Sequence, residues 1–120
     1  DNIINNEFKM IYVTSVKPGE IKGPHLHTKR NSCFTCIHGE VVFVIQKKLG
    51  EYEEIHATAD KPVLVVIPKN VSAAHINVSD GISRVLTLAD LSWKPSDDEM
   101  SNVSFNDYDW NKWKKTKPSN

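Results

Sequence analysis

The sequence predicts an all-β fold, a sandwich or barrel of short strands, on the basis of two observations. About eight or nine short apolar segments, rich in β-branched and aromatic residues, follow one another along the chain. Turn-forming residues separate them, for example Pro18-Gly19 and Ser79-Asp80-Gly81. This rhythm is typical of all-β sandwiches and barrels, and 120 residues are enough to bury one such core but not two.

The first half of the chain is expected to hold four strands: residues 11–16, a histidine strand that starts at Gly23-Pro24, residues 31–37 and residues 40–46. Lys17-Pro18-Gly19 ends the first of these strands, and His38-Gly39 separates the third from the fourth. Residues 40–46 are almost all β-branched or aromatic, which predicts a strand that is buried on both faces.

The second half is expected to hold four more strands after a hairpin turn at residues 47–51: residues 52–57, 63–67, 73–78 and 82–88. Residues 63–67 again form a buried strand in this prediction. Beyond Lys94-Pro95 the rhythm is lost, and residues 95–99 are expected to form a loop or a helical turn. Trp110 and Trp113 predict a short helix or extended tail that packs onto the barrel.

The charges and cysteines limit the choice of partners and of compartment. Fifteen basic and fifteen acidic residues cancel, so neither nucleic acid nor a membrane surface is expected as a partner. No apolar run approaches the ~20 residues that cross a bilayer. Cys33 and Cys36 would face opposite sides of a strand, which is poor geometry for a disulfide. Both are expected to be small core residues in a reducing, cytoplasmic setting.

Two histidines, His25 and His27, are the most informative residues of the chain. Side chains at positions i and i+2 of a strand share a face, so both imidazoles should enter the same space. Two histidines that point into a small barrel are either metal ligands or proton-transfer groups. The residues around them bear on that choice.

These residues resemble the two sequence motifs of the cupin family. Gly19, the pair His25-x-His27 and Gly39 match the first motif, and Pro68-x-Asn70 with Asn77 is similar to the second. The resemblance implies a cupin jelly-roll barrel over about residues 8–93. Residues 94–120 would then be a short irregular or helical tail of a single domain, residues 1–120.

Two metal-ligand positions of the cupin pattern hold other residues in this chain. Ser32 stands at the position of the acid and Ala73 at that of the second-motif histidine. Two imidazoles alone make a weak site for Fe, Mn or Zn. His75, two residues beyond Ala73, could supply a displaced third ligand beside His25 and His27. We predict a metal-free barrel whose histidines carry out acid–base chemistry.

Among metal-free cupins, the chain resembles enzymes that rearrange nucleotide-linked 4-keto-6-deoxysugars, such as dTDP-sugars. The sugar 3,4-ketoisomerases carry a tyrosine before an Arg-Gly-x-His-x-His-x-Lys segment. Here Tyr12 precedes the segment from Lys22 to Lys29, with Lys22 in the arginine position. The resemblance implies isomerisation by proton transfer through an enediol, without a cofactor, in the biosynthesis of surface glycans.

The same resemblance assigns roles to single residues and implies the partners. His25, His27 and Tyr12 would be catalytic. Residues that would bind the substrate are Lys22, Lys29, Arg30 and His75. A nucleotide-diphosphate sugar is the expected partner and a homodimer the expected assembly, while the base and the stereochemistry of the sugar stay open.

Three other interpretations remain open. A 3,5-epimerase has a similar layout and would use Asp107 to orient a histidine, but its tyrosine acid falls at about Ser92. A zinc-dependent 3-epimerase cupin would need the metal-binding acid that Ser32 replaces. A cupin that binds a sugar or a metal without catalysis is the alternative from a different functional class.

Overall fold

The computed structural model describes residues 8–90 and 100–114. Within these residues the chain forms nine β-strands followed by a short 3-10 helix. The strands are β1 (Met10–Val16), β2 (Ile21–His27), β3 (Ser32–His38), β4 (Glu40–Lys48), β5 (Glu51–Thr58), β6 (Val65–Ile67), β7 (Ala73–Asn77), β8 (Ser83–Ala89) and β9 (Met100–Asn102), and the helix η1 spans Trp110–Trp113. The predicted all-β architecture is confirmed.

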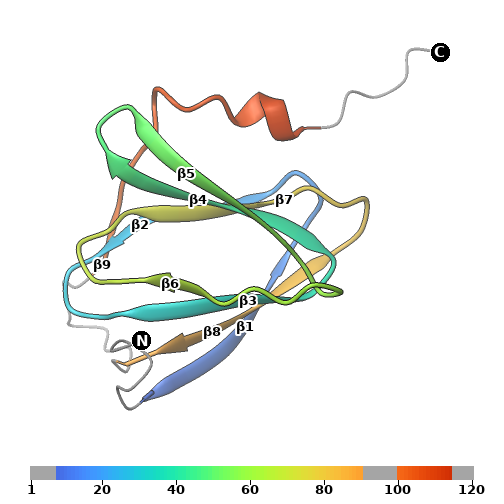
Figure 1. The fold of residues 1–120 in the computed structure, drawn as a ribbon, viewed down its shortest axis with the longest axis horizontal. Coiled ribbons are helices and arrows are strands. Elements are labelled where there is room, and N and C mark those ends of the chain that lie inside the picture. Colours follow the sequence, from blue (N-terminus) through green and yellow to red (C-terminus); the bar gives the residue numbers. More distant parts are fainter. Residues whose placement is uncertain (1–7, 91–99, 115–120) are drawn as a thin grey trace.

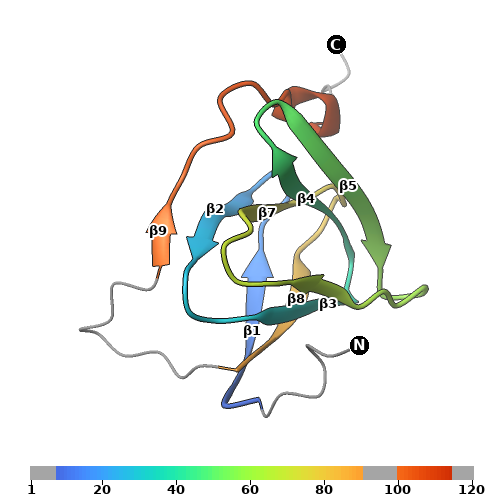
Figure 2. The same cartoon turned by 60° about the vertical axis from the view of Figure 1, so that its left-hand side comes forward.

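The strands form two antiparallel sheets that face each other (Figure 1, Figure 2). One sheet has the order β1-β8-β3-β6 and the other the order β5-β4-β7-β2-β9. Successive strands mostly alternate between the sheets, so side chains from distant parts of the sequence meet in the space between them. This crossing pattern brings β1, β2, β3 and β7 around one interior.

Strand β4 is buried on both faces, as predicted for this apolar run. Its inner side chains Val41, Phe43 and Ile45 belong to the core between the two sheets. Val42 and Val44 point to the outer face, where they form a second apolar cluster with side chains of the C-terminal segment. Burial of both faces explains why this strand has no polar alternation in its sequence.

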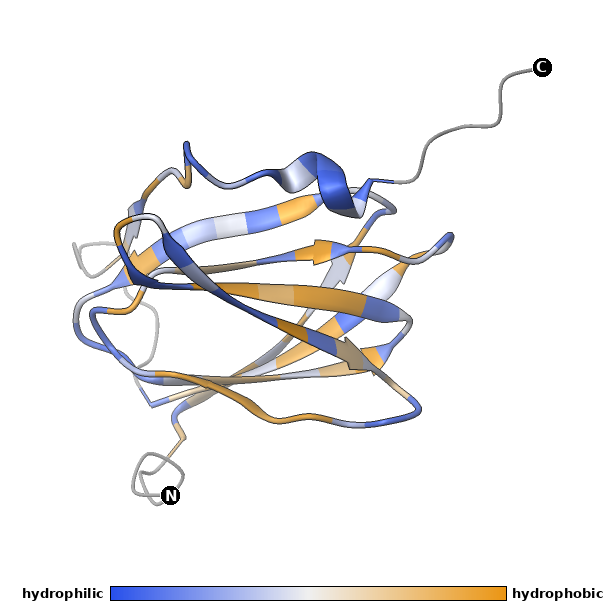
Figure 3. Ribbon diagram, turned by 45° about the horizontal axis from the view of Figure 1, so that its top comes forward, coloured by the Kyte–Doolittle hydropathy of each residue, from blue (hydrophilic) through white to orange (hydrophobic). Residues whose placement is uncertain are grey.

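The C-terminal segment covers the outer face of the five-stranded sheet (Figure 1). Trp110 and Trp113 of η1 pack against the outer cluster, as expected for this tail, and of the two forms expected, a short helix or an extended tail, the helix is present. The indole N–H of Trp113 donates to the Tyr108 hydroxyl at 2.7 Å. Apolar residues concentrate along the strands, whereas η1 is largely hydrophilic (Figure 3). No helix in the described segments has the length and apolar character needed to cross a membrane.

The strand predicted over residues 63–67 is shorter than expected. Pairing with β3 begins only at Val65, opposite Phe34, so β6 has three residues. Val63 and Leu64 precede this pairing and are 36% and 47% exposed. β3 itself continues to His38, so the run is shortened by where its pairing with β3 begins and not by the end of the partner strand, and its buried residues are Val65 and Ile67. The predicted loop or turn at residues 95–99 lies outside the described residues.

Both cysteines are buried and unpaired, as expected. Cys33 is 1% exposed and Cys36 is 2% exposed. Burial raises the pKa of both thiols, so neither is activated as a thiolate. They act as small core residues.

Candidate active site

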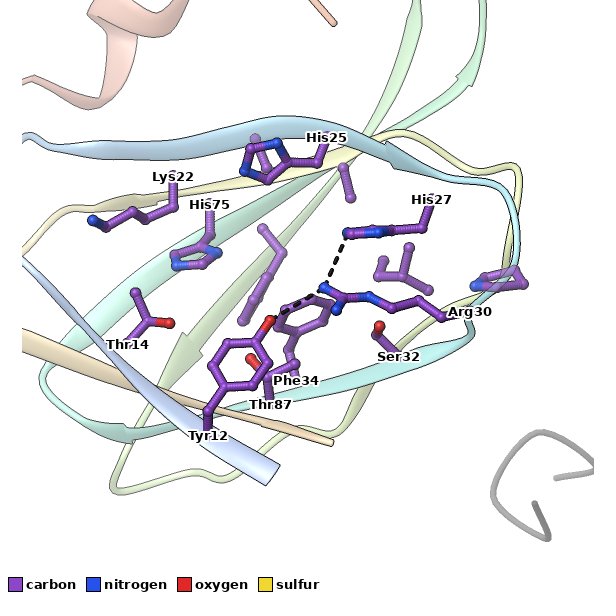
Figure 4. Close-up of a pocket in the computed structure, with 15 residues that line it drawn as sticks. Tyr12, Thr14, Lys22, His25, His27, Arg30, Ser32, Phe34, His75 and Thr87 are labelled. Carbon is purple, nitrogen blue, oxygen red and sulfur yellow. Dashed lines mark hydrogen bonds between the residues drawn. The ribbon is translucent and has the colours of Figure 1, made fainter. Parts of the chain in front are cut away.

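A cavity of about 150 Å³ lies between the two sheets and is lined by side chains from both (Figure 4). Six of the residues that the sequence singled out line it together: Tyr12, Lys22, His25, His27, Arg30 and His75. They come from β1, β2, the connection between β2 and β3, and β7. The jelly-roll crossing of the chain is what brings these segments to one place.

A bulge in β2 turns three of these side chains to the same side. Lys22 pairs with His75 of β7, and His25 pairs with Ala73, so two strand positions in β7 oppose three in β2. Residues three apart in a regular strand face opposite sides. The extra residue in the bulge removes this alternation, and Lys22, His25 and His27 all line the cavity.

Gly23 makes the bulge possible. Its φ is +91°, in the left-handed region, and an added Cβ would lie 3.0 Å from the Ala73 carbonyl oxygen. It would also lie 3.1 Å from the backbone nitrogen of His25. A side chain at this position would therefore push β2 away from β7.

Arg30 lies inside the cavity and links two of the predicted catalytic residues. Its guanidinium donates to the Tyr12 hydroxyl at 3.2 Å. The same nitrogen lies 3.0 Å from Nε2 of His27 (Figure 4). Only 9% of the residue is exposed. Arg30 therefore ties β1 to the end of β2 through a chain of hydrogen bonds.

His75 is a neutral imidazole on the inner face of β7. Its pKa is lowered to about 4, mainly by burial and to a smaller extent by the nearby charges of Lys22 and His25. Its ring lies against Phe43 and Phe34, with centroid distances of 5.4 and 6.3 Å. At neutral pH this side chain can donate or accept a hydrogen bond without carrying charge.

Four buried polar atoms around the cavity have no hydrogen-bond partner: Nδ1 of His25, Nε of Arg30, Oγ of Ser32 and Nε2 of His75. Buried polar groups in proteins are almost always hydrogen-bonded. Side chains such as Phe34 and Phe43 give the same cavity an apolar wall. The site therefore suits a small ligand that has several hydrogen-bonding groups and an apolar edge.

The structure does not bring two predicted residues to the cavity. Lys29 is exposed and does not line it. Asp107 accepts a hydrogen bond from the Tyr52 hydroxyl, beside the outer cluster of the five-stranded sheet. The sheet separates Asp107 from the histidines, because the turn that carries it packs on the outer face. It does not orient either histidine in this structure.

Sequence reasoning missed several residues that line the cavity, among them Thr14 and Thr87. Thr14 is two residues beyond Tyr12 on β1, so strand alternation alone could have found it. Thr87 pairs with Tyr12 on one side and with Phe34 on the other. Finding Thr87 requires the order of the strands in the sheet, which no local pattern provides.

The residues of the cavity do not fit the metal site of many cupins. The described part of the chain holds no group of three or more His, Cys, Asp or Glu side chains arranged to bind a metal. Nε2 of His27 faces the Arg30 guanidinium, a cation, rather than a position that a metal ion would share. Ser32, at the acid position, contributes only a hydroxyl. We therefore derive no reaction step through a metal.

Comparison with solved structures shows the same fold in a capsular polysaccharide assembling protein and in two sugar epimerases. The capsular polysaccharide assembling protein CapF from Staphylococcus aureus superposes with a TM-score of 0.76 at 22% identity, over 82% of this chain and 29% of that chain. The dTDP-4-dehydrorhamnose 3,5-epimerase from Elizabethkingia anophelis gives 0.73 at 16% identity, over 87% and 62%.

A third structure, the 3'-monoepimerase ChmJ from Streptomyces bikiniensis, gives a TM-score of 0.70 at 15% identity, over 80% of this chain and 52% of that chain. The chain thus spans less than two thirds of the length of each of these proteins. These likenesses confirm the predicted cupin jelly roll. Comparison with curated protein sequences gave no match.

The family model described as "FdtA: WxcM-like, C-terminal" matches residues 1–110, which is most of the chain. This is a family of nucleotide-sugar isomerases, so the predicted enzyme class is confirmed at the level of the family. The chain belongs to the FdtA family of cupin domains.

Proposed function

We propose that this chain moves the ketone of a nucleotide-linked 4-keto-6-deoxysugar from C4 to C3, without a metal, in the biosynthesis of a surface glycan. One observation carries the proposal. Two imidazoles and a tyrosine hydroxyl line one small cavity, with the ring centroids of His25 and His27 6.3 Å apart. The family of the chain supports the same reaction.

The reaction transfers two protons. A base removes the proton from C3, and the enediolate that forms takes a proton on O4. A proton then adds to C4 while O3 loses its proton, which leaves the ketone at C3. Imidazole titrates near neutrality and serves well for such steps. In this proposal one of the two histidines, His25 or His27, handles the proton that moves between C3 and C4, and the other handles the proton on the oxygens O3 and O4. The Tyr12 hydroxyl hydrogen-bonds the oxygen on which charge develops.

The cavity suits the sugar rather than the whole nucleotide sugar. Its 150 Å³ is below the roughly 300–1,000 Å³ of pockets that enclose a drug-sized ligand. Phe34, Phe43 and Ile67 offer an apolar wall for the C6 methyl group. His75 offers a neutral hydrogen-bonding group for a sugar hydroxyl.

Lys22 is the residue that we expect to hold the diphosphate. It lines the cavity, yet its side chain is 36% exposed, so it lies between the interior and solvent. Its ammonium group now pairs with Glu20 at 3.2 Å, a contact that a phosphate could replace. Lys29 is exposed and outside the cavity, which makes it a weaker choice for this role.

We also propose that the enzyme acts as a homodimer. β1 is an edge strand among the described strands of its sheet. Ile11 and Val13, on the outer face of β1, are 66% and 50% exposed, which is unusual for two large apolar residues on one strand. A second copy that covers this face would remove both from water.

The test is proton NMR of dTDP-4-keto-6-deoxyglucose with the protein in deuterated water. Deuterium incorporation that accompanies a ketone at C3 is the expected result. Exchange at C3, or at C3 and C5, with the ketone still at C4 would identify an epimerase, the reaction of the structural neighbours. No exchange above the blank would contradict catalysis on this substrate and favour a binding module.

Variants at the histidines check their assignment. His25→Asn and His27→Asn should each lower turnover by about 100-fold or more while nucleotide binding changes little, because general acid–base catalysis typically contributes that much. His38→Asn, at an exposed position that ends β3, is the matched control. Unchanged turnover in either pocket variant would rule out a catalytic role for that histidine.

A further inference from the structure

The guanidinium of Arg30 makes two hydrogen bonds from a single nitrogen. One joins it to the Tyr12 hydroxyl at 3.2 Å and the other to Nε2 of His27 at 3.0 Å. A terminal guanidinium nitrogen has two hydrogens, so these two contacts use both. With 9% of the residue exposed, solvent cannot replace them freely.

The direction of both hydrogen bonds follows from the chemistry of arginine. A guanidinium has five N–H donors and no acceptor, and it stays protonated in proteins. Nε2 of His27 must therefore accept, so the ring is neutral and carries its proton on Nδ1. The Tyr12 oxygen also accepts, so its own hydrogen has to point elsewhere.

Neutral histidine in water favours the other tautomer, with the proton on Nε2. The contact with Arg30 therefore reverses the intrinsic preference of His27. Figure 4 shows the Arg30 guanidinium between Tyr12 and His27. The Tyr12 hydrogen, once excluded from the Arg30 side, can be donated to a bound ligand.

We propose that Arg30 is a positioning residue that sets where the protons lie on two reactive side chains, holding His27 as the Nδ1–H tautomer and leaving the Tyr12 hydroxyl as a donor into the cavity. This role deepens the proposed isomerase function and rests on it: with Nε2 bonded to Arg30 and Nδ1 protonated, His27 serves the oxygen side of the reaction as a hydrogen-bond donor, and removal of the C3 proton falls to His25. It differs from the substrate-binding role expected from the sequence, because the end of the side chain is bonded to pocket residues rather than directed to solvent.

The first test needs no substrate. Histidine nitrogen chemical shifts of the ¹⁵N-labelled protein distinguish a protonated ring nitrogen from an accepting one. We expect Nε2 of His27 to have the shift of an acceptor in the native protein. In Arg30→Met the shifts should move towards the Nε2–H form. A native His27 with its proton on Nε2, or shifts that do not change in Arg30→Met, would overturn the proposal.

The second test separates positioning from substrate binding. Arg30→Met should lower kcat by about 100-fold with a KM within threefold of the native value, as expected when reactive groups lose their alignment. Arg30→Lys keeps the charge but loses the fork of donors. Compared with Arg30→Met, it should therefore recover more of the native folding stability than of the native kcat. A raised KM at unchanged kcat in either variant would mean that Arg30 binds the substrate instead.

Arg84→Met is the matched control, since Arg84 is exposed on β8. It should change neither the His27 shifts nor the kinetics. Failure of the proposed function can be distinguished from failure of this inference. A native protein with the expected tautomer but no exchange on the keto sugar refutes the isomerase and leaves the hydrogen-bonding role of Arg30 standing.

Discussion

His75 illustrates how the surroundings of one residue change its chemistry. Three histidines line the cavity, but His75 is the one that lies against both Phe34 and Phe43, with 7% of its surface exposed. Protonation would place a charge among aromatic rings and near Lys22, and its pKa is lowered to about 4 for this reason. The residue is thus suited to hydrogen bonding and not to taking up a proton during the reaction.

Folding stability should report this burial as a dependence on pH. Between pH 6.5 and about 4 the unfolded chain binds a proton at His75 that the folded chain does not. The free energy of unfolding therefore falls as the pH is lowered through this window, by roughly 3 kcal/mol from this residue. Above pH 6.5 the residue contributes no pH dependence.

His75→Leu should remove the part of the pH dependence of unfolding free energy that comes from this residue. Urea unfolding of the native protein and of this variant at pH 7 and at pH 4.5 provides the measurement. His38→Leu, at an exposed position, is the control. Equal slopes in the native protein and His75→Leu would show that His75 is not the source.

Single residues also show the limit of what the sequence could predict. Tyr12, His25 and His27 were identified by spacing and by resemblance, and they do line one cavity. Lys29 and Arg30 are adjacent and both cationic, yet one is exposed and the other is buried. Which of the two enters the cavity depends on the path of the chain from β2 to β3, and no local pattern records that path.

At the scale of elements, the strands were predictable because turn residues mark their ends. Pro18-Gly19 and residues 79–81 separate strands in the structure as they did in the prediction. The bulge in β2 was not predictable, because it exists only in the pairing with β7. The length of β6 was overestimated for a related reason, since the pairing with β3 starts only at Val65 and the sequence of the run itself does not show this.

The bulge gives a prediction that separates local strain from the geometry of the site. Gly19 and Gly23 both have positive φ, at +77° and +91°. An added Cβ at Gly19 meets nothing within 4 Å, whereas at Gly23 it meets backbone atoms at 3.0 and 3.1 Å. Both alanine variants should lose about 1–2 kcal/mol of folding stability, because alanine adopts the left-handed conformation at that cost.

Gly23→Ala should lose more folding free energy than Gly19→Ala, and its isomerisation rate should fall at least tenfold. The reason is that β2 must shift and carries Lys22 and His25 with it. Urea unfolding and the deuterium-exchange assay measure the two effects. Gly19→Ala should keep its activity. Similar losses of activity in both variants would mean that the bulge does not determine the position of the catalytic side chains.

At the scale of the whole molecule, the two outer faces of the sandwich differ. The C-terminal segment covers the five-stranded sheet with an aromatic cluster that includes Trp110 and Trp113. On the four-stranded sheet Ile11 and Val13 remain exposed. A dimer through the four-stranded sheet would give both faces a cover.

Val13→Glu should therefore shift the protein from dimer to monomer in sedimentation velocity, because a buried carboxylate without a partner opposes association. Glu53→Gln, at an exposed position of β5 in the other sheet, is the control and should sediment as the native protein does. A native protein that is monomeric at all concentrations would contradict the proposed assembly.

Successive side chains of β1 alternate between the cavity and the outer face of the sheet. Tyr12 points into the cavity, while its neighbours Ile11 and Val13 point outward. A partner that held the outward residues would also fix the strand that carries the Tyr12 hydroxyl, for which we propose a catalytic role. The activity per molecule of enzyme should then fall on dilution below the dissociation constant of the dimer. The total reaction rate would therefore rise more steeply than in proportion to the concentration of this protein.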